Sequence, residues 1–460
     1  MIQGGKRPYL DFFYPQVPLS AYFNAGLLGV FGQSWRGLRA SSALLTGASV
    51  LLVAGFVFAR IPERSWRLAA AMTTALLVGL DERVILYGTI AQPYGLCLFL
   101  IVAAFRLVIE AVDRPTGWVP ALAGLCAGGA AASSLLTAPV VPILSLWMAR
   151  HTRTGDRLIK GICFLAGAAI PFLPLLWLTV QAPRQALFDV VEYHGFYRWS
   201  VAHASSPPFG QVILSIVWWN VRELVGLLDS AQGVLLVLLT AAGLLFLRAR
   251  PAWEAPRRPE FGSCTWLAGG LAVYLAAIPS TVANYFVLVI PFLAILASLG
   301  VYAIGSTIGG RLRPGWLVLL IVTLFASGLA RPVYETAKDF RDHRYQWYWR
   351  AYEAIGREIN RVTPKDELVW ADGCTYFAAR RVPPSGMENF YSSFLQLPPT
   401  LAASLHVVPG ARLEEWLAAG RFATVVIGAD DHRVEALGLP SLYAHRKTLH
   451  GYEIFWDRIR

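Results

Sequence analysis

Apolar segments separated by short polar connections occupy most of the sequence between residues 36 and 331. A helix needs about 20 apolar residues to cross the hydrocarbon core of a bilayer, and most of these segments approach that length. Ten of them are candidate spans, at about 36–59, 66–82, 92–112, 117–134, 136–149, 161–181, 231–248, 263–280, 284–306 and 314–331. The pattern therefore predicts a polytopic α-helical membrane protein with about ten spans.

The sequence ahead of the first predicted span changes its pattern at Pro18. Three prolines between residues 8 and 18 remove backbone donors and disfavour helix in the residues before them, so we expect an irregular loop there. From Leu19 to Phe31 the apolar residues follow helical spacing, and Gly32 is suited to end the helix. Such a helix rises only about 20 Å, which is too short to cross a bilayer. We predict a helix that lies in the membrane interface.

Basic residues gather in alternate connections between the predicted spans, for example from Arg150 to Lys160. The positive-inside rule places these connections in the cytoplasm, so the segments 182–230 and 332–460 face outward. A span at 212–228 would invert every later loop, and we expect a second interfacial helix there. The same orientation places Met1 outside with no apolar segment ahead of it. We therefore expect either that a first span precedes this sequence in the gene or that the first helix was lost.

The tail has a more polar composition than the rest of the chain. Helical patterns at 345–361 and 411–420 alternate with strand-like segments at 367–371, 423–428 and 452–456, which predicts a small α/β domain. We therefore divide the chain into three parts: an external loop and interfacial helix at 1–35, a transmembrane domain at 36–331 with the external loop 182–230, and an extracytoplasmic α/β domain at 332–460.

Composition agrees with the membrane interpretation. The chain is 56% hydrophobic with a mean hydropathy of +0.49, above the average of soluble domains. Its net charge of +11 could suggest a nucleic-acid partner, but the basic residues lie in short loops between apolar segments, so we expect none. The five cysteines are scattered without metal or disulfide spacing. We expect no cofactor; a divalent cation is left open, although no motif indicates one.

Three segments resemble the GT-C superfamily of membrane-embedded glycosyltransferases, in particular bacterial homologues of protein O-mannosyltransferase and aminoarabinose transferase. The second, Ala91 to Leu96, is similar to the family's "RPYxL" helix opening, and the third, Tyr285 to Pro291, to its "RYLLPLLP" segment, with Asn284 in place of the arginine. The first runs from residue 4 to residue 48 and matches the family pattern at Gly5, Tyr9, Asp11, Pro18-Leu19, Phe31-Gly32 and Arg39.

The resemblance implies a transferase that moves a sugar from a polyprenyl-phosphate donor to an extracytoplasmic lipid, glycan or protein acceptor, with inversion. It implies a place in the inner (plasma) membrane of a bacterium, with the C-terminal domain facing the periplasm or exterior. The family carries a catalytic Asp-Glu pair at the end of its first span, upstream of the point where this chain begins. The reaction needs a carboxylate base, donors for the leaving phosphate and an apolar groove for the prenyl chain.

Few acids near the membrane face outward in this topology, namely Asp11, Asp81, Glu82, Asp189 and Glu192. Asp11 is the first candidate for the catalytic base and Glu82 the second. Aromatic residues flank Asp11, and we expect Tyr9 and Tyr14 to stack on a sugar; the alternative is an aspartate that caps a turn.

Two further groups of residues are candidates for substrate binding. Asp81 lies beside Glu82 where a helix leaves the bilayer, and Tyr94 lies in the second family segment. The alternative for Asp81 and Glu82 is a solvated helix end. For the lipid phosphate the candidates are Arg184, His194 and Arg198, since arginine suits phosphate geometry; the alternative is ordinary anchoring at the interface.

Two other functions stay open at this point. A membrane transporter or lipid flippase would usually carry ionisable residues within its spans and internal repeats, neither of which is evident here. A truncated, non-catalytic homologue is the other alternative, because the family's upstream acids are missing from this sequence.

Overall fold

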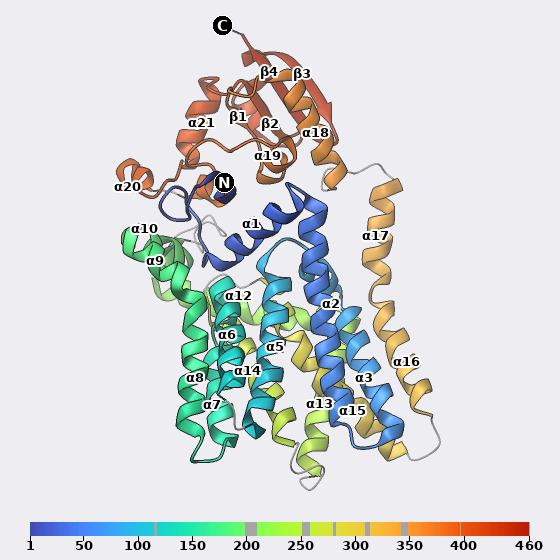
Figure 1. Cartoon of the computed structure of the whole chain (residues 1–460). Coiled ribbons are helices and arrows are strands. Elements are labelled where there is room, and N and C mark those ends of the chain that lie inside the picture. The colour runs from blue at the N-terminus through green and yellow to red at the C-terminus, as the bar shows by residue number, and fades with distance from the viewer. Residues whose placement is uncertain are drawn as a thin grey trace. The chain divides into compact units, whose positions relative to one another are not determined.

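The computed structural model describes residues 1–114, 117–197, 209–250, 258–278, 282–308, 313–341, 348–395 and 397–459 (Figure 1). The chain divides into two compact units. The helical unit comprises Gln16–Trp177 and Ser205–Ala330. The sheet unit comprises Met1–Pro15, Leu178–Ala204 and Arg331–Arg460, so three segments far apart in the sequence fold together. The three-part division expected from the sequence stays a prediction.

Six segments among the described residues are helical, long and apolar enough to cross a membrane. They are α2 (Trp35–Arg60), α5 (Pro93–Asp113), α8 (Arg157–Ala169) continued through η3 (Ile170–Phe172) into α9 (Leu173–Gln181), α13 (Ala231–Ala249), α15 (Ile290–Ile308), and α16 (Pro314–Ser327) followed by α17 (Ala330–Arg341).

The other four predicted spans also coincide with helices, but these do not reach the same length and hydropathy. They are α3 (Arg64–Gly79), α6 (Trp118–Ser133), α7 (Val140–His151) and α14 (Arg258–Ala277). The 16 residues of α3 and of α6 rise about 24 Å, less than the hydrocarbon thickness of about 30 Å. The helical elements are as predicted, while the count of ten spans stays a prediction.

The core of the helical unit surrounds α15. Its residues are buried along most of the helix, and it packs against α13, α3 and α14. Aromatic rings form part of this core: the centroid of Phe56 lies 5.0 Å from Phe105 and 5.5 Å from Phe261, and Phe105 lies 5.6 Å from Phe292. Helices distant in sequence are thereby joined by interlocked apolar side chains.

The interfacial helix predicted from the sequence forms with the expected bounds. It is α1 (Leu19–Phe31), and Gly32 ends it with a φ of 65°, a left-handed conformation that favours glycine. A second helix, α12 (Phe209–Val225), covers most of the segment predicted at 212–228. Short helices η5 (Gly226–Asp229) and η6 (Ala283–Leu288) precede α13 and α15. The depth of α1 and α12 in a membrane stays a prediction.

Helices α6 and α8 approach so closely that only glycine fits at their contact. A Cβ atom at Gly124 would lie 1.9 Å from the carbonyl oxygen of Phe164, and one at Gly128 would lie 2.1 Å from that of Ala168. Small residues at such contacts let helix backbones pack closely in membranes.

Gly124→Ala is therefore expected to lower the free energy of unfolding by about 1–3 kcal/mol, because the backbones must separate. Gly129→Ala is the matched control, since its Cβ would meet Leu100 Cδ1 at an ordinary 3.4 Å. Thermal unfolding of both variants in detergent checks the difference. Equal midpoints for the two variants would contradict the close packing.

The sheet unit contains a four-stranded sheet in the order β1-β2-β4-β3 within the described part of the tail. The strands are β1 (Val369–Trp370), β2 (Thr424–Gly428), β3 (Tyr443–Leu449) and β4 (Tyr452–Arg458). The β1–β2 pair is parallel, and β4 pairs antiparallel with both β2 and β3. Alternate residues of β4 enter two apolar clusters, Phe455 on one face and Ile454 on the other.

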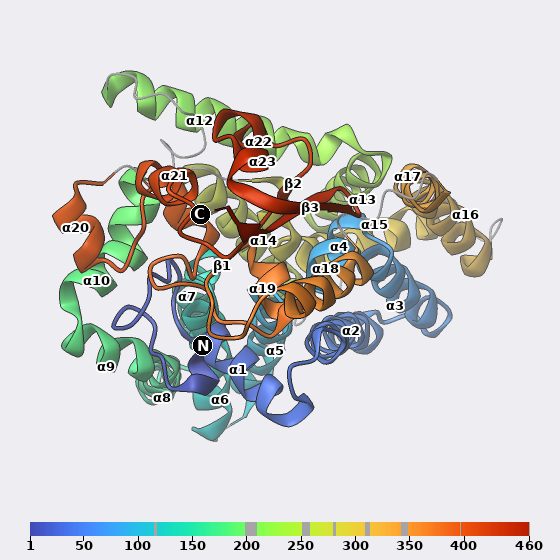
Figure 2. The same cartoon turned by 90° about the horizontal axis from the view of Figure 1, so that it is seen from above.

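Helices complete the sheet unit on both faces of the sheet. Figure 2 shows α18 (Trp349–Val362) beside α19 (Gly373–Ala379), and both contribute to the cluster around Ile454. The cluster around Phe455 contains residues of α21 (Gly410–Ala418), α22 (Arg433–Ala436) and α23 (Leu439–Leu442). The remaining helices are α20 (Pro399–Ser404) and η7 (Phe390–Phe394). The helices and strands expected in the tail are present. The strand β3, the helix α17 and the short helices α19, α20, α22, α23 and η7 were not predicted.

Candidate active site

Asp11 closes a tight turn in the N-terminal loop of the sheet unit. Its Oδ2 accepts a hydrogen bond from the backbone N–H of Arg7 at 2.7 Å and one from Arg7 Nε at 3.4 Å. The Asp11 N–H in turn donates to the carbonyl of Arg7. These are the contacts of a turn-capping aspartate, the alternative left open by the sequence. The Asp11 side chain is still 34% exposed, so solvent can reach its carboxylate.

The two tyrosines that flank Asp11 differ in accessibility. Tyr9 is fully buried and adopts a φ of 68° in the turn, where its N–H donates to the carbonyl of Phe12. Its ring therefore contributes to the interior of the loop. Tyr14 is half-buried, and its ring meets that of Phe12 edge-on. Their substrate-binding roles stay predictions, and Tyr14 presents the more accessible ring.

The segment after α9 folds against this N-terminal loop. It comprises α10 (Pro183–Leu187) and η4 (Phe188–Tyr197), a π-helix. The backbone N–H of Tyr14 donates to Asp189 Oδ2 at 2.8 Å, and His194 Nε2 donates to the carbonyl of Pro15 at 2.7 Å. The ring of Phe13 packs against Phe188 and Tyr193. The structure thus brings the Asp11 loop and the predicted phosphate-binding segment together.

Asp189 is the buried acid at the centre of this contact. It is only 1% exposed, and its Oδ1 is one of the few buried polar atoms in the described residues without a hydrogen-bond partner. Burial raises the pKa of the Asp189 carboxyl to about 8, against the lowering effect of the hydrogen bond from Tyr14. At neutral pH this raised pKa favours the protonated form of the Asp189 carboxyl.

The three candidates for the lipid phosphate have different outcomes. Arg184 is exposed and forms an ion pair with Glu192. His194 is half-buried and bound to the N-terminal loop. Arg198 lies outside the described residues. Their roles in phosphate binding stay predictions.

Two basic residues missed as candidates lie directly beside the Asp11 turn. Lys6 forms an ion pair with Glu388 at 3.0 Å, and Arg7 Nη1 donates to Gln181 Oε1 at 3.2 Å. They tie the N-terminal loop to the tail and to the end of α9. The sequence signal that could have identified them is their position in the first family segment, immediately before the Pro-Tyr-Leu-Asp sequence.

In the helical unit, the family segments meet one another. Asn284 Nδ2 donates to the hydroxyl of Tyr94 at 2.9 Å, which joins the second and third segments. Tyr94 also lies between the rings of Tyr87 and Tyr285, with centroids 6.1 and 6.5 Å away. Asn284, which replaces the family's arginine, is thus a hydrogen-bond donor to the tyrosine of the neighbouring segment.

Two further hydrogen bonds join the first family segment to the second segment and to the connection just before it. Arg39 Nε donates to the carbonyl of Thr89 at 3.3 Å, and Asn24 Nδ2 donates to that of Ala91 at 3.4 Å. Both acceptors lie at the connection between α4 (Glu82–Gly88) and α5. Residues from all three segments therefore gather in one part of the helical unit.

Asp81 and Glu82 hold the start of α4. Asp81 is 1% exposed, and its Oδ1 accepts from the N–H groups of Arg83 at 2.9 Å and Val84 at 3.2 Å, as an N-cap does. The N–H of Glu82 donates to Gln232 Oε1 at 3.1 Å, while the Glu82 side chain is partly exposed. Of these two acids, Glu82 is the one whose carboxylate solvent can reach.

The candidates are thus divided between the two units. The sheet unit holds Asp11, Tyr9, Tyr14, Arg184 and His194; the helical unit holds Glu82, Asp81 and Tyr94. In the ranges that the structure describes, no group of three or more His, Cys, Asp or Glu side chains could hold a metal ion. The chemistry available in these groups is acid–base catalysis and hydrogen bonding to phosphate and hydroxyl groups.

No family model and no curated protein matches the sequence. Among solved structures, the chain is similar to ArnT from Cupriavidus metallidurans bound to undecaprenyl phosphate, with a TM-score of 0.64, 16% identity and coverage of 99% of this chain and 91% of that chain. The apo structure of the same protein gives a TM-score of 0.65, 15% identity and coverage of 98% and 89%. An apo oligosaccharyltransferase from Archaeoglobus fulgidus gives a TM-score of 0.44, 16% identity and coverage of 92% and 63%.

The likeness to ArnT extends over nearly the whole length of both chains. At this identity it defines the fold, which is that of an integral membrane protein and agrees with the long apolar helices. ArnT, an aminoarabinose transferase, is a GT-C glycosyltransferase. The chain therefore has the fold of ArnT, in agreement with the family resemblance of its three sequence segments.

Proposed function

We propose that the chain is a glycosyltransferase that moves a sugar from a polyprenyl-phosphate donor to an extracytoplasmic lipid, glycan or protein acceptor, with inversion. The observation that carries the proposal is the ArnT fold over 99% of the chain, because the ArnT structure was determined with undecaprenyl phosphate bound. The proposed sugar is a hexose or a pentose. The meeting of the family segments around Tyr94 also favours a glycosyltransferase.

In the proposed reaction the acceptor hydroxyl oxygen attacks the anomeric carbon of the sugar. The bond from that carbon to the phosphate oxygen breaks, the polyprenyl phosphate leaves, and the hydroxyl proton passes to a carboxylate. We assign the carboxylate to Asp11, because it is held by Arg7 and is accessible. Glu82 is the second candidate. We propose that four residues hold the sugar or acceptor, either directly or through the loops that they fix. These residues are Tyr9, Tyr14, Asp81 and Tyr94.

The leaving phosphate needs positively charged donors, which Arg184, His194 and Arg198 are proposed to supply. Arg184 is exposed, so its guanidinium can exchange Glu192 for a phosphate without a change of fold. Interfacial helices such as α1 are proposed to guide the prenyl chain.

Arg184→Ala is expected to weaken binding of undecaprenyl phosphate about tenfold or more, since one hydrogen bond to a charged group contributes roughly 1.5–3 kcal/mol. Affinity is measured on the full-length protein in nanodiscs. Undecaprenol, which lacks the phosphate, should bind wild type and variant alike. Arg361→Ala is the matched control, because Arg361 is also exposed and paired with a glutamate, Glu358. Equal affinities of the Arg184 variant and wild type for undecaprenyl phosphate would remove Arg184 from the site.

We further propose ten spans in a bacterial inner membrane, with 182–230 and 332–460 on the periplasmic or outer side. Reporter fusions after Gly210 and after Arg361 are expected to give the same signal, opposite to a fusion after Arg153. The reason is the excess of basic residues in the connection that contains Arg153. Opposite signals from the two outward fusions would overturn this topology.

A further inference from the structure

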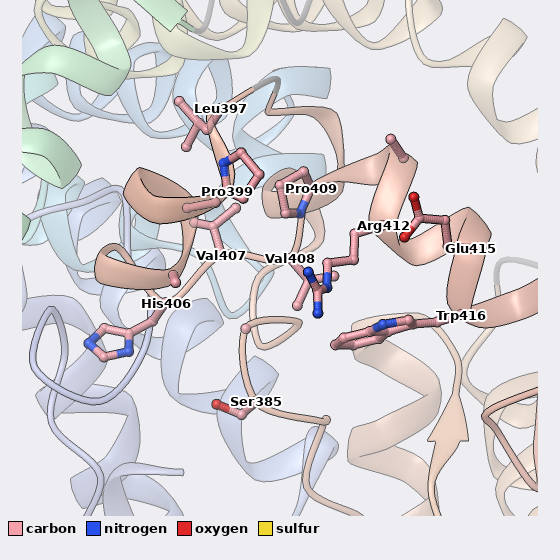
Figure 3. A pocket seen from close by; sticks show the side chains of 14 residues that line it. Ser385, Leu397, Pro399, His406, Val407, Val408, Pro409, Arg412, Glu415 and Trp416 are labelled. Atoms are coloured by element: carbon pink, nitrogen blue, oxygen red, sulfur yellow. The ribbon is translucent and has the colours of Figure 1, made fainter.

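A cavity of about 460 Å³ lies in the sheet unit, and none of the residues proposed for catalysis lines it. Figure 3 shows it between α20, α21 and the loops that precede them. Its volume falls within the roughly 300–1,000 Å³ typical of ligand pockets. Side chains of the tail alone line it, so it is complete within one unit.

Trp416 forms one wall of this cavity as a flat, partly exposed ring. The guanidinium of Arg421 lies 4.0 Å from the ring centroid, and the Phe422 ring packs against the indole with a centroid separation of 6.5 Å. These contacts fix the orientation of the indole. Arg412, one turn earlier on α21, places its guanidinium 5.7 Å from the same centroid, on the cavity side in Figure 3.

The floor of the cavity is fixed by backbone hydrogen bonds. The N–H of Val408 donates to the carbonyl of Gly386 at 2.9 Å, and the N–H of Gly386 donates to Glu388 Oε2 at 2.7 Å. Gly386 has a φ of 83°, and a Cβ there would lie 2.8 Å from Val408 Cγ2. The floor therefore requires glycine and is formed before any ligand arrives.

The polar groups that line the cavity distinguish between classes of ligand. Arg412 can only donate hydrogen bonds, Glu415 when ionised can only accept them, and Ser385 can do both. Hydroxyl groups satisfy all three, whereas a phosphate would meet the charge of Glu415. The flat apolar face of a pyranose can stack on the indole once the Arg412 guanidinium moves from its place over the ring to a hydroxyl of the sugar. An alkyl chain would offer no hydrogen-bond partner to the exposed Arg412 and Glu415.

We propose that this cavity is a carbohydrate subsite that binds a neutral saccharide unit, with Trp416 as the stacking platform and Arg412, Glu415 and Ser385 as hydroxyl partners. That this saccharide belongs to the acceptor rests on the proposed transferase function. The tail then recognises a glycan part of the acceptor.

The test is saturation-transfer NMR on the full-length protein in nanodiscs, free of sugar-based detergent. The probes are three neutral trisaccharides: maltotriose, mannotriose and chitotriose. At least one is expected to bind, and Trp416→Leu should weaken it about tenfold, the loss expected from one stacked aromatic contact. Trp416→Phe retains a ring and should preserve binding. Arg412→Ala, at an exposed position, should weaken it without affecting folding.

Arg433→Ala is the matched control, because Arg433 also lies over a tryptophan, 5.1 Å from the centroid of Trp370, and is not part of the cavity. It should leave binding unchanged. The subsite would be overturned if none of the trisaccharides received saturation from the protein. It would also be overturned if wild type, Trp416→Leu and Arg412→Ala bound the trisaccharide equally.

The binding assay contains no lipid donor, so it separates the two proposals. A chain that transfers sugar but binds no trisaccharide overturns the subsite alone. A chain that binds a trisaccharide through Trp416 but transfers no sugar supports the subsite and overturns the transferase.

Discussion

Asp11→Asn is expected to lower the rate of sugar transfer about 10²–10⁴-fold, the usual loss when a positioned general base is removed. Asparagine keeps the shape of the side chain and can still accept the hydrogen bond from the Arg7 N–H. It cannot take a proton from the acceptor hydroxyl. The measurement is the initial rate of transfer from a polyprenyl-phosphate sugar, with the full-length gene product in membranes.

Asp431→Asn is the matched control for the turn contact. The Asp431 carboxylate accepts from the N–H and from Nε of Arg433, both at 3.0 Å, which repeats the arrangement of Asp11 and Arg7. Loss of that contact should cost about 1 kcal/mol of stability and leave turnover nearly intact. If Asp11→Asn keeps more than about a tenth of wild-type turnover, the base lies elsewhere, and Glu82→Gln is the next variant to measure.

Local sequence signals predicted the elements that depend on them. Prolines before residue 19 and Gly32 set the bounds of α1, because each acts through its own backbone geometry. Runs of apolar residues predicted a helix at each candidate span, and the structure has a helix at each of them. The span count could not be settled in the same way, because α7 has only 12 residues and α3 and α6 have 16 each, and length alone leaves their depth undefined.

Two of the elements missed in the tail, β3 and α19, lack the usual patterns. Strand β3 is exposed at five of its seven positions, so it shows no apolar alternation, and it forms because β4 offers a hydrogen-bonding edge. Helix α19 has only seven residues, too few for periodicity to be evident. Both depend on tertiary partners rather than on local preference.

The sequence predicted those parts of the candidate site that lie in the family segments. The meeting of Tyr94 with Asn284 joins two segments that the sequence had already singled out. The pairing of Tyr14 with Asp189 joins residues 175 positions apart, and nothing local to either residue indicates it. Asp189 was one of several outward acids in the sequence. Its burial, which it shares with Asp81, together with an Oδ1 that has no hydrogen-bond partner, distinguishes it from the others.

Asp189→Asn is expected to stabilise the protein increasingly as the pH rises from about 4 to about 8. Burial raises the folded-state pKa of Asp189 to about 8, from an ordinary value of 3.8. Between these two values the folded state keeps the proton while the unfolded state releases it. The stability that this carboxyl contributes is therefore complete below pH 4 and is lost as the pH rises toward 8, by up to about 1.4 kcal/mol per pH unit.

Asparagine cannot ionise, and its side-chain oxygen still accepts the hydrogen bond from the Tyr14 N–H. The pH-dependent loss should disappear with the substitution, while the contact between the two loops remains. The measurement is the thermal midpoint of both proteins in detergent from pH 5 to pH 8, and the difference between variant and wild type should widen steadily. A constant difference across this range would mean that Asp189 is ionised in the folded protein, with a cation or solvent beside it. The burial of an unpaired Oδ1 argues against that arrangement, because an ionised carboxylate without a partner is costly in an apolar surrounding.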